Sequence, residues 1–596
     1  IVIDAFDNGS YIEVIPEKNT VIGYTTKNSG GVTPDFKNYF VIEFDTPFAS
    51  SDVWSDSKVV PGKKELEANH VGAIIGFKTR RGQTVQAKVS SSFISFDQAW
   101  LNLKELGDGN FERIKKSGRD RWNDILGRIQ VEGGSTDQYR TFYSCFYRSV
   151  LFPRKFYEIN AQGEPVHYSP YEGGVKKGFL YTDTGFWDTF RALFPFLNLM
   201  YPSVNEEIQA GLANAYKESG FLPEWASPGH RFCMVGNNSA SVVADAFLKG
   251  IGVEYSETLY DALLAATDKV HPDVPSTGRW GADYYNKLGY VPYDVKIPEN
   301  VARTLEYAYD DWCIMQMAKK LGRPEKEIEL FRNRSLNYKN VFDKSHNLMR
   351  GKNQDGSFQT PFNPYKWGDA FTEGNSWHYT WSVFHDVQGL IDLMGGKKTF
   401  VQMLDSVFVV PPIYDDSYYG FCIHEIKEMQ IMNMGNYAHG NQPIQHMLYL
   451  YNYAGEPWKA QYWIREVMDR MYTAAPDGYC GDEDNGQTSA WYVFSAMGFY
   501  PVCPGTDQYV IGTPLFKKMT VTLENDKKIV LNAPDVTKEN RYIKRIKLNG
   551  KEYTPTWFSY SRLKQGAVID YEMSNVPNKK RGIDKKDFPY SLSNEK

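Results

Sequence analysis

The chain has 596 residues, 42% of them hydrophobic, which is enough for a large core and for more than one domain. Its net charge of −5 argues against a nucleic-acid-binding protein, because such proteins usually carry a basic surplus. No run of about 18 apolar residues is present, so no transmembrane helix is expected.

Residues 1–107 are predicted to form an antiparallel β-sandwich, because β-rich segments alternate with Gly, Pro, Asn and Ser turns. These segments are residues 11–15, 39–44, 72–77 and 85–89. The chain begins at Ile1 with the pattern of a strand interior and not of a signal peptide, so we expect this sandwich to be incomplete. A helical linker is expected over residues 108–135, with a helix from Phe111 to about Ile129.

From residue 136 to residue 505 apolar residues recur at three and four positions, which is typical of helices. The expected helices are residues 138–150, 187–199, 205–218, 239–249, 256–267, 301–321, 325–341, 380–393, 443–452, 459–471 and 489–497. A closed ring of paired helices, an (α/α)6 barrel, accounts for this number; a helical-repeat solenoid is the alternative, although no fixed sequence period is present. Strands return in a C-terminal β-rich segment over residues 506–596, at residues 518–523, 528–531 and 543–548.

Three consecutive acids, Asp482, Glu483 and Asp484, stand between glycines and an apolar run. They do not form an EF-hand loop, because Val493 occupies the twelfth position counted from Asp482, where a glutamate is needed. The stretch is either a functional loop or an acidic turn that caps a helix starting near Ser489.

Polar and aromatic clusters are expected at helix ends, where a helical barrel would place a pocket. Each has an ordinary structural explanation, since tryptophans often belong to a core and amides cap helices. Together they supply acids, amides and aromatics suited to sugars, and no serine or cysteine nucleophile motif. The candidate residues are Trp187, Asp188, Trp225, Glu373, His424, Glu425, Asn441 and Gln442, with the acidic stretch.

A metal site of the zincin type is not indicated at His424-Glu425, because the fourth residue after His424 is Glu428 and not histidine. Carboxylate and amide oxygens instead suit a hard cation such as Ca²⁺. The six cysteines contain no CxxC pair, so we expect mostly buried free thiols.

Long blocks of this sequence resemble glycoside hydrolase family 92, the calcium-dependent exo-acting α-mannosidases. The resemblance runs from about Asp108 to near the C-terminus, in the order of that family. The blocks include residues 186–191, 222–225, 373–379, 440–443, 481–501 and 509–516.

The resemblance implies a β-sandwich lying against an (α/α)6 barrel, with a site between them that hydrolyses terminal α-mannosides with inversion. Inversion needs a carboxylic acid for the leaving oxygen and a carboxylate that activates water. By similarity, Glu373 is the acid and Asp484 the base, with Asp482 as helper or alternative base.

Further roles follow from the same resemblance. Asn441 and Gln442 are expected at a calcium site, and Trp187, Asp188 and Trp225 around the terminal sugar. His424-Glu425 resembles the pair that α-1,2-preferring members place beside the leaving sugar, so α-1,2-linked mannosides of mannose-rich glycans are the expected substrates. The resemblance also implies a location outside the cytoplasm.

One departure from the family lies at the N-terminus, where residues 1–10 lack the Gly-, His- and Pro-rich stretch expected to contribute an aromatic to the leaving-group side. Two alternatives stay open from the residues themselves. The ring could carry another chemistry, as in glucoamylase-like or phosphorylase-like enzymes, or the chain could bind glycans without catalysis.

Overall fold

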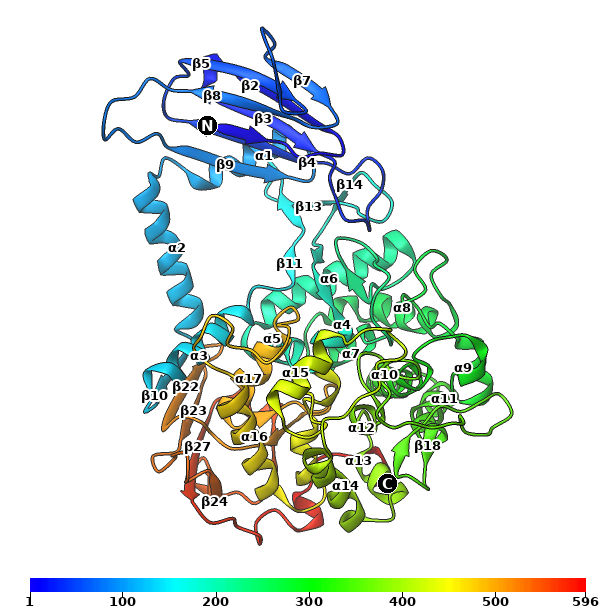
Figure 1. Cartoon of the computed structure of the whole chain (residues 1–596). Coiled ribbons are helices and arrows are strands. Elements are labelled where there is room, and N and C mark those ends of the chain that lie inside the picture. The colour runs from blue at the N-terminus through cyan, green and yellow to red at the C-terminus, as the bar shows by residue number, and fades with distance from the viewer. Residues whose placement is uncertain (596) are drawn as a thin grey trace.

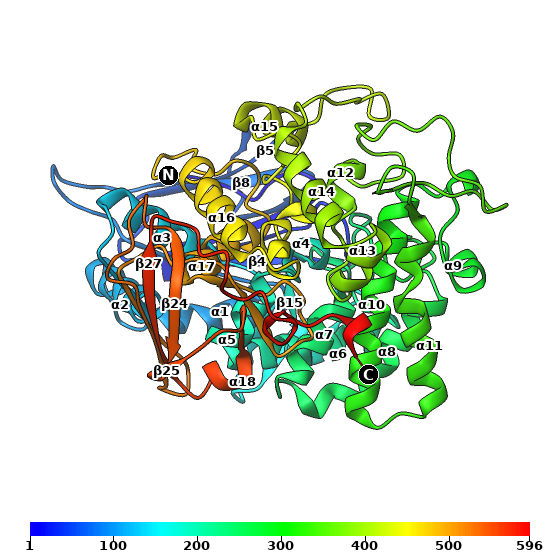
Figure 2. The ribbon, with the colours of Figure 1, turned by 90° about the horizontal axis from the view of Figure 1, so that it is seen from below.

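Residues 1–595 are described by the computed structural model, and they form an N-terminal β-sandwich above a larger, mainly helical body (Figure 1). A C-terminal sheet lies on one side of that body. Seen from below, the helices surround the centre of the body, and the C-terminal strands β24 and β27 stand outside them (Figure 2). No helix within residues 1–595 is long and apolar enough to cross a membrane.

The N-terminal sandwich consists of two antiparallel sheets, with strand orders β1-β8-β5-β6 and β7-β2-β3-β4-β9. Alternate residues of β2 are buried, and Ile12, Val14 and Val53 belong to the core of the sandwich. The predicted sandwich is thus confirmed, with more strands than expected. Its strands are β1 (Val2–Asp4), β2 (Ser10–Ile15), β3 (Thr20–Thr25), β4 (Asn38–Phe44), β5 (Ser50–Ser55), β6 (Lys58–Val60), β7 (Glu65–Ala68), β8 (Val71–Gly76) and β9 (Ala87–Ser92).

The chain passes from the sandwich to the body through helices α1 (Phe96–Leu103) and α2 (Phe111–Leu126). Helix α1, capped by Ser95, covers the second sheet, and the exposed helix α2 descends to the body (Figure 1). Strand β10 (Ile129–Glu132) follows Gly127 and pairs with β22 of the C-terminal sheet. The expected helix therefore ends earlier than Ile129, because Ile129 is buried as a strand residue.

A small sheet and one loop join the sandwich to the body. In β12, Glu158 accepts hydrogen bonds from the Phe93 amide at 2.8 Å and the Ser92 hydroxyl at 3.0 Å. The loop between β3 and β4 reaches the body, where Arg231 donates to the Ser29 hydroxyl at 3.1 Å (Figure 1). The short strands of the body are β11 (Arg154–Lys155), β12 (Tyr157–Ile159), β13 (Pro165–Tyr168), β14 (Val175–Lys177), β15 (Tyr181–Thr182), β16 (Thr184–Gly185), β17 (Trp225–Ala226), β18 (Phe342–Asp343) and β19 (Leu348–Met349).

The helices of the body form a closed array. The last of them, α17, packs against α3 and α5, whereas an open solenoid would leave its first and last helices apart. The prediction of a helical barrel is confirmed over that of a solenoid. The helices are α3 (Thr136–Arg148), α4 (Phe186–Thr189), α5 (Leu193–Met200), α6 (Pro202–Ser219), α7 (Ser239–Leu248), α8 (Ser256–Asp268), α9 (Ala282–Leu288), α10 (Asn300–Leu321), α11 (Glu325–Ser335), α12 (Ser376–Tyr379), α13 (Val387–Leu393), α14 (Lys397–Val409), α15 (His424–Met432), α16 (Pro457–Met471) and α17 (Gln487–Met497).

Several helices differ from their sequence-based bounds. The stretch expected as one helix at residues 187–199 is broken between α4 and α5, where the Gln487 side chain accepts hydrogen bonds from the amides of Ala192 and Leu193 at 2.9 and 3.2 Å. A distant side chain thus satisfies the helix start, which local periodicity does not reveal. Residues 443–452 fold as two short 3₁₀ turns instead of one α-helix.

The C-terminal segment forms a mixed sheet in the order β10-β22-β23-β27-β24-β25. It contains the three predicted strands, and β24 packs against α16. A small sheet, β20-β21-β26, lies after α17. These strands are β20 (Phe499–Tyr500), β21 (Gln508–Ile511), β22 (Lys518–Thr522), β23 (Lys528–Asn532), β24 (Tyr542–Leu548), β25 (Lys551–Glu552), β26 (Trp557–Ser559) and β27 (Ala567–Ser574); helix α18 (Tyr560–Leu563) follows β26.

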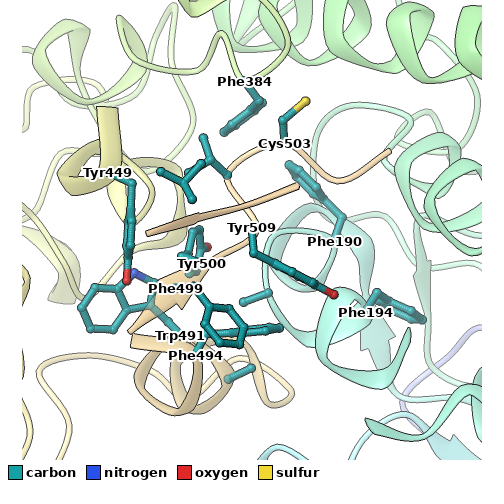
Figure 3. Close-up of a cluster of buried hydrophobic side chains, with 14 of the residues drawn as sticks. Phe190, Phe194, Phe384, Tyr449, Trp491, Phe494, Phe499, Tyr500, Cys503 and Tyr509 are labelled. Atoms are coloured by element: carbon teal, nitrogen blue, oxygen red, sulfur yellow. The ribbon is translucent and has the colours of Figure 1, made fainter. Parts of the chain in front are cut away.

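Aromatic side chains fill the centre of the body (Figure 3). The rings of Phe190 and Phe384 meet edge to face with centroids 5.6 Å apart, and Tyr449 stacks on Tyr500 at 4.9 Å. The indole N–H of the buried Trp491 donates to the backbone carbonyl of Gln445 at 3.0 Å. These aromatic side chains therefore belong to the core on which the polar loops rest.

Candidate active site

Two loops cross at a pair of glycines, Gly440 and Gly481. A Cβ atom built on Gly481 would lie 2.5 Å from the Cα of Gly440, so a side chain there would push the backbones apart. A Cβ on Gly440 would meet the Glu428 carboxylate at 2.7 Å. This crossing brings the acidic stretch beside the Asn441-Gln442 pair.

The three consecutive acids point to different surroundings. Glu483 accepts a hydrogen bond from the Gly486 amide at 2.7 Å, in the turn just before α17. The Asp482 side chain is 68% exposed. Asp484, with φ of 51°, accepts a hydrogen bond from the Gln442 side-chain amide. The stretch thus forms the turn before α17 and also presents Asp484 to the inside.

Glu373 lies two residues before the Asn375 cap of α12, in a turn where its φ is 45°. Its backbone is held from both sides. The Tyr419 hydroxyl accepts a hydrogen bond from the Glu373 amide at 3.0 Å, and the Asn441 side-chain amide donates to the Glu373 carbonyl at 2.7 Å. The half-buried carboxyl is therefore carried by a fixed backbone.

The dipeptide Asn441-Gln442 connects Glu373 with Asp484, because one amide binds each of them. Burial, together with the charges of Glu425 and Asp484, raises the pKa of Glu373 to about 8. Burial, together with the charge of Asp482, raises the pKa of Asp484 to about 6, although the hydrogen bond from Gln442 lowers it. Two carboxyl groups of different proton affinity thus share one site.

Asp188 lies near both of them. Burial and the charges of Asp484 and Glu373 raise the pKa of Asp188 well above its ordinary value. A Cβ on Gly185 would lie 3.2 Å from Asp188 Oδ2 and 2.8 Å from the Trp225 ring, so this glycine lets the indole approach the carboxyl. Trp187 is only 2% exposed and belongs to the core, whereas Trp225 is half-buried.

Helix α15 begins with His424 and adds further charges. His424 Nε2 lies 3.1 Å from Glu425 Oε1 and 3.8 Å from Asp482 Oδ2, and its Nδ1 lies 2.9 Å from Glu428 Oε1. Desolvation opposes protonation, but the Glu428 hydrogen bond and the surrounding carboxylates raise the pKa of His424 above its usual value. The His424-Glu425 pair therefore stands beside the acidic stretch.

Comparisons with known proteins identify the family of the chain. The model of the "Glycosyl hydrolase family 92 catalytic domain" matches residues 98–575, and that of the "Glycosyl hydrolase family 92 N-terminal domain" matches residues 1–92. The chain belongs to glycosyl hydrolase family 92. The site lies in the part matched to the family 92 catalytic domain.

Two solved family 92 structures are similar over nearly the whole chain. An inverting mannosidase of Bacteroides thetaiotaomicron VPI-5482 is 49% identical, with a TM-score of 0.94 over 99% of this chain and 80% of that one. An α-mannosidase of Bacteroides thetaiotaomicron, solved with mannoimidazole, is 33% identical, with a TM-score of 0.88 over 98% of this chain and 76% of that one. These similarities confirm the expected fold.

A curated relative from Arthroderma benhamiae bears the name "Uncharacterized secreted glycosidase". It is 28% identical over 548 residues, which are 85% of this chain and 63% of that protein. The chain thus spans less than two thirds of this relative's length.

One unpartnered amide oxygen of this family 92 site is a candidate ligand for a metal ion. Gln442 is buried, and its Oε1 has no hydrogen-bond partner among residues 1–595. In Asn441, by contrast, Oδ1 accepts a hydrogen bond from the backbone N–H of Gln442 at 3.1 Å, and Nδ2 donates to the Glu373 carbonyl. Within the same residues no group of three or more His, Cys, Asp or Glu side chains could hold a metal ion. A free amide oxygen fits a hard cation whose other ligands are carbonyls, water or sugar hydroxyls.

Some residues around the site were not anticipated as such. Tyr419 is one of them. Its hydroxyl accepts a hydrogen bond from the Glu373 backbone amide, and no sequence pattern indicates such a contact. Glu428 is another, and its position four residues after His424 would have indicated a shared helix face. The third is Glu299, whose carboxylate contacts Arg303 at 2.9 Å and adds to the negative charge around Glu373.

Proposed function

We propose that the chain is an exo-acting, inverting α-mannosidase that releases terminal mannose, α-1,2-linked, from mannose-rich glycans with the help of calcium. The observation that carries this proposal is the hydrogen-bonded bridge in which Asn441 binds Glu373 and Gln442 binds Asp484. Two carboxyl groups distant in the sequence thereby share a site, as the chemistry of an inverting glycosidase requires. The relatives described as mannosidases support mannose as the sugar that is released. The mannoimidazole complex of one of them supports a site shaped for mannose.

Glu373 acts in this proposal as the general acid. With a pKa raised to about 8, its carboxyl keeps a proton at neutral pH. That proton passes to the glycosidic oxygen as the bond to the anomeric carbon breaks, so the leaving sugar departs as a neutral alcohol.

Asp484 acts as the general base. Its pKa, raised to about 6, leaves it ionised at neutral pH while making it more basic than an exposed aspartate. It takes a proton from a water molecule whose oxygen bonds to the anomeric carbon on the face opposite the leaving group. The exposed Asp482 contributes negative charge beside it.

Gln442 would hold the calcium ion through Oε1, while the Gln442 amide keeps Asp484 oriented. The ion would supply positive charge and Lewis acidity at the hydroxyls of the terminal mannose. Asp188 and Trp225 would bind the same sugar, and the buried Trp187 would support them from the core.

His424 and Glu425 are proposed to bind the leaving sugar and to favour the α-1,2 linkage. Their side chains lie within 3.1 Å of one another and supply a donor and an acceptor for sugar hydroxyls. The relative described as a secreted glycosidase supports an action outside the cytoplasm.

One assay separates this function from its alternatives. The protein is incubated with an aryl α-mannoside and with α-1,2-mannobiose, with and without EDTA, and the anomer first released is followed by NMR. Release of β-mannose that stops with EDTA is the expected result. Turnover only with added phosphate would indicate a phosphorylase, and binding without turnover would indicate a glycan-binding protein.

A further inference from the structure

Three aromatic side chains, Phe232, Trp280 and Tyr418, lie beside the proposed site without a part in the chemistry described above. Phe232 is 63% exposed and Tyr418 is 43% exposed, which is unusual for rings of this size. Trp280 is half-buried, and its ring centroid lies 6.3 Å from that of Phe232. These three residues are called the aromatic wall.

The aromatic wall comes close to the site at two points, one near Glu373 and the other near Asp188. At one end, Tyr418 packs on Gly368, where an added Cβ would approach its ring to 2.3 Å, and the adjacent Tyr419 accepts the hydrogen bond from the Glu373 amide. At the other end, Phe232 stands two residues before Met234, whose methyl group would lie 3.2 Å from a Cβ on Gly185, beside Asp188.

An ion pair joins the two ends. The Glu299 amide donates to the carbonyl of Asp369, the residue after Gly368, at 2.7 Å. The Glu299 carboxylate binds Arg303 at 2.9 Å, and the Arg303 guanidinium lies 5.0 Å from the centre of the Trp280 ring. Contacts thus link Trp280, through Arg303 and Glu299, to Asp369, which follows the glycine on which Tyr418 packs.

The outer end of the wall lies at the junction with the N-terminal sandwich. Arg231, the residue before Phe232, donates to the Ser29 hydroxyl in the loop between β3 and β4 (Figure 1). Phe232 therefore stands next to a residue that contacts the N-terminal sandwich.

We propose that the aromatic wall binds the sugars that follow the leaving mannose in a longer chain, so that the protein prefers extended mannosides over disaccharides. This inference rests on the proposed function. Glu373 is the proposed acid for the leaving oxygen, so Tyr418, whose neighbour Tyr419 binds the Glu373 amide, is placed toward the leaving-group side. Exposed rings offer flat apolar faces to the C–H surfaces of sugars, while Arg303 and Glu299 can bind hydroxyls.

The test compares substrates of different length in the wild type and in variants of two exposed residues. Wild-type KM is measured for an aryl α-mannoside, α-1,2-mannobiose and a linear α-1,2-mannotetraose. We expect KM to fall from the disaccharide to the tetrasaccharide. Phe232→Ala and Tyr418→Ala should each raise KM for the tetrasaccharide by about tenfold, the effect of losing one stacking contact, and by less for the aryl mannoside. Phe111→Ala, a 66% exposed phenylalanine on α2, is the matched control and should change none of these values.

Binding is measured independently of turnover. Calorimetry with the Glu373→Gln protein and mannotetraose should show weaker binding when Phe232→Ala is added to it. Equal KM for short and long substrates in the wild type, or unchanged tetrasaccharide affinity in both wall variants, would overturn the aromatic wall as a binding surface. Because calorimetry needs no hydrolysis, a failure of the mannosidase assignment is distinguished from a failure of the wall.

Discussion

The side-chain amide of Gln442 donates a hydrogen bond to the carboxylate of Asp484. The preceding residue, Asn441, donates to the backbone carbonyl of Glu373 at 2.7 Å, so one dipeptide holds both proposed catalytic residues. Any displacement of this dipeptide changes the separation of acid and base, on which the room for the attacking water depends.

Replacement of the acid, Glu373→Gln, should lower kcat/KM for α-1,2-mannobiose by roughly 10²–10⁴-fold. The loss should be much smaller for an aryl mannoside with a good leaving group, because such a group departs without a proton. Steady-state kinetics on both substrates measures the difference. Glu112→Gln, on the exposed face of α2, is the control. Equal losses on both substrates would remove Glu373 from the role of acid.

The base is tested by a pair of variants. Asp484→Asn should abolish hydrolysis of both aryl and natural mannosides, because water attack is needed in each case. Asp482→Asn should reduce activity only a few-fold, since its side chain is 68% exposed and acts through its charge on Asp484. Retained activity in Asp484→Asn together with a large loss in Asp482→Asn would move the base to Asp482.

The pH dependence of kcat/KM should be bell-shaped. Activity rises with pH as Asp484 ionises near its raised pKa of about 6, since only the carboxylate can accept a proton. It falls as pH passes the raised pKa of Glu373, about 8, since only the protonated form can donate. In Glu373→Gln the alkaline limb should vanish while the acidic limb stays. An alkaline limb that persists in this variant would belong to another group.

The parts of the fold that local patterns describe were predictable. The 22-residue helix α10 carries apolar residues through its whole length, and β2 alternates buried and half-buried residues. The pairing of β10 with β22 was not predictable, because it joins segments far apart in the sequence. For the same reason the break before α5, satisfied by Gln487, could not be read from periodicity.

The site was predictable as a set of residues more than as a geometry. The resemblance to family 92 identified Glu373 and Asp484, and the structure connects them through Asn441-Gln442. Sequence alone could not show that both the oxygen and the nitrogen of the Asn441 side chain form hydrogen bonds within the protein, whereas Gln442 Oε1 has no partner among residues 1–595. That distinction depends on hydrogen bonds between loops, which no local pattern encodes.

Calcium binding is tested through stability. Addition of Ca²⁺ to EDTA-treated protein should raise Tm, because a ligand at about 100 times its Kd stabilises the folded state by about 2.7 kcal/mol. Gln442→Ala should shrink this shift, since it removes the free oxygen. Gln430→Ala, an exposed glutamine on α15, should keep the full shift. A wild-type Tm that responds to neither EDTA nor Ca²⁺ would count against a calcium site.

The crossing of the two site loops is tested by Gly440→Ala. The new methyl group would lie 2.7 Å from the Glu428 carboxylate and 2.8 Å from the Cys480 carbonyl, and the carbonyl belongs to backbone that must move. We expect a loss of about 1–3 kcal/mol in the free energy of unfolding, typical of overpacking, measured by urea denaturation. Activity on all mannosides should fall as well, because separating the loops draws Asp484 away from Gln442.

Gly118→Ala on α2 is the matched control for that change. A Cβ there meets nothing within 4 Å, so this variant should be neutral or more stable by up to about 1 kcal/mol, the helix propensity difference between alanine and glycine. If Gly440→Ala matched Gly118→Ala in both stability and kcat/KM, the close approach of Gly440 and Gly481 would have no part in holding the acidic stretch in place. A fall in activity without a fall in stability would instead mean that the substitution changes only the orientation of Asp484. In that case mannose binding, measured by calorimetry, would be kept while turnover is lost.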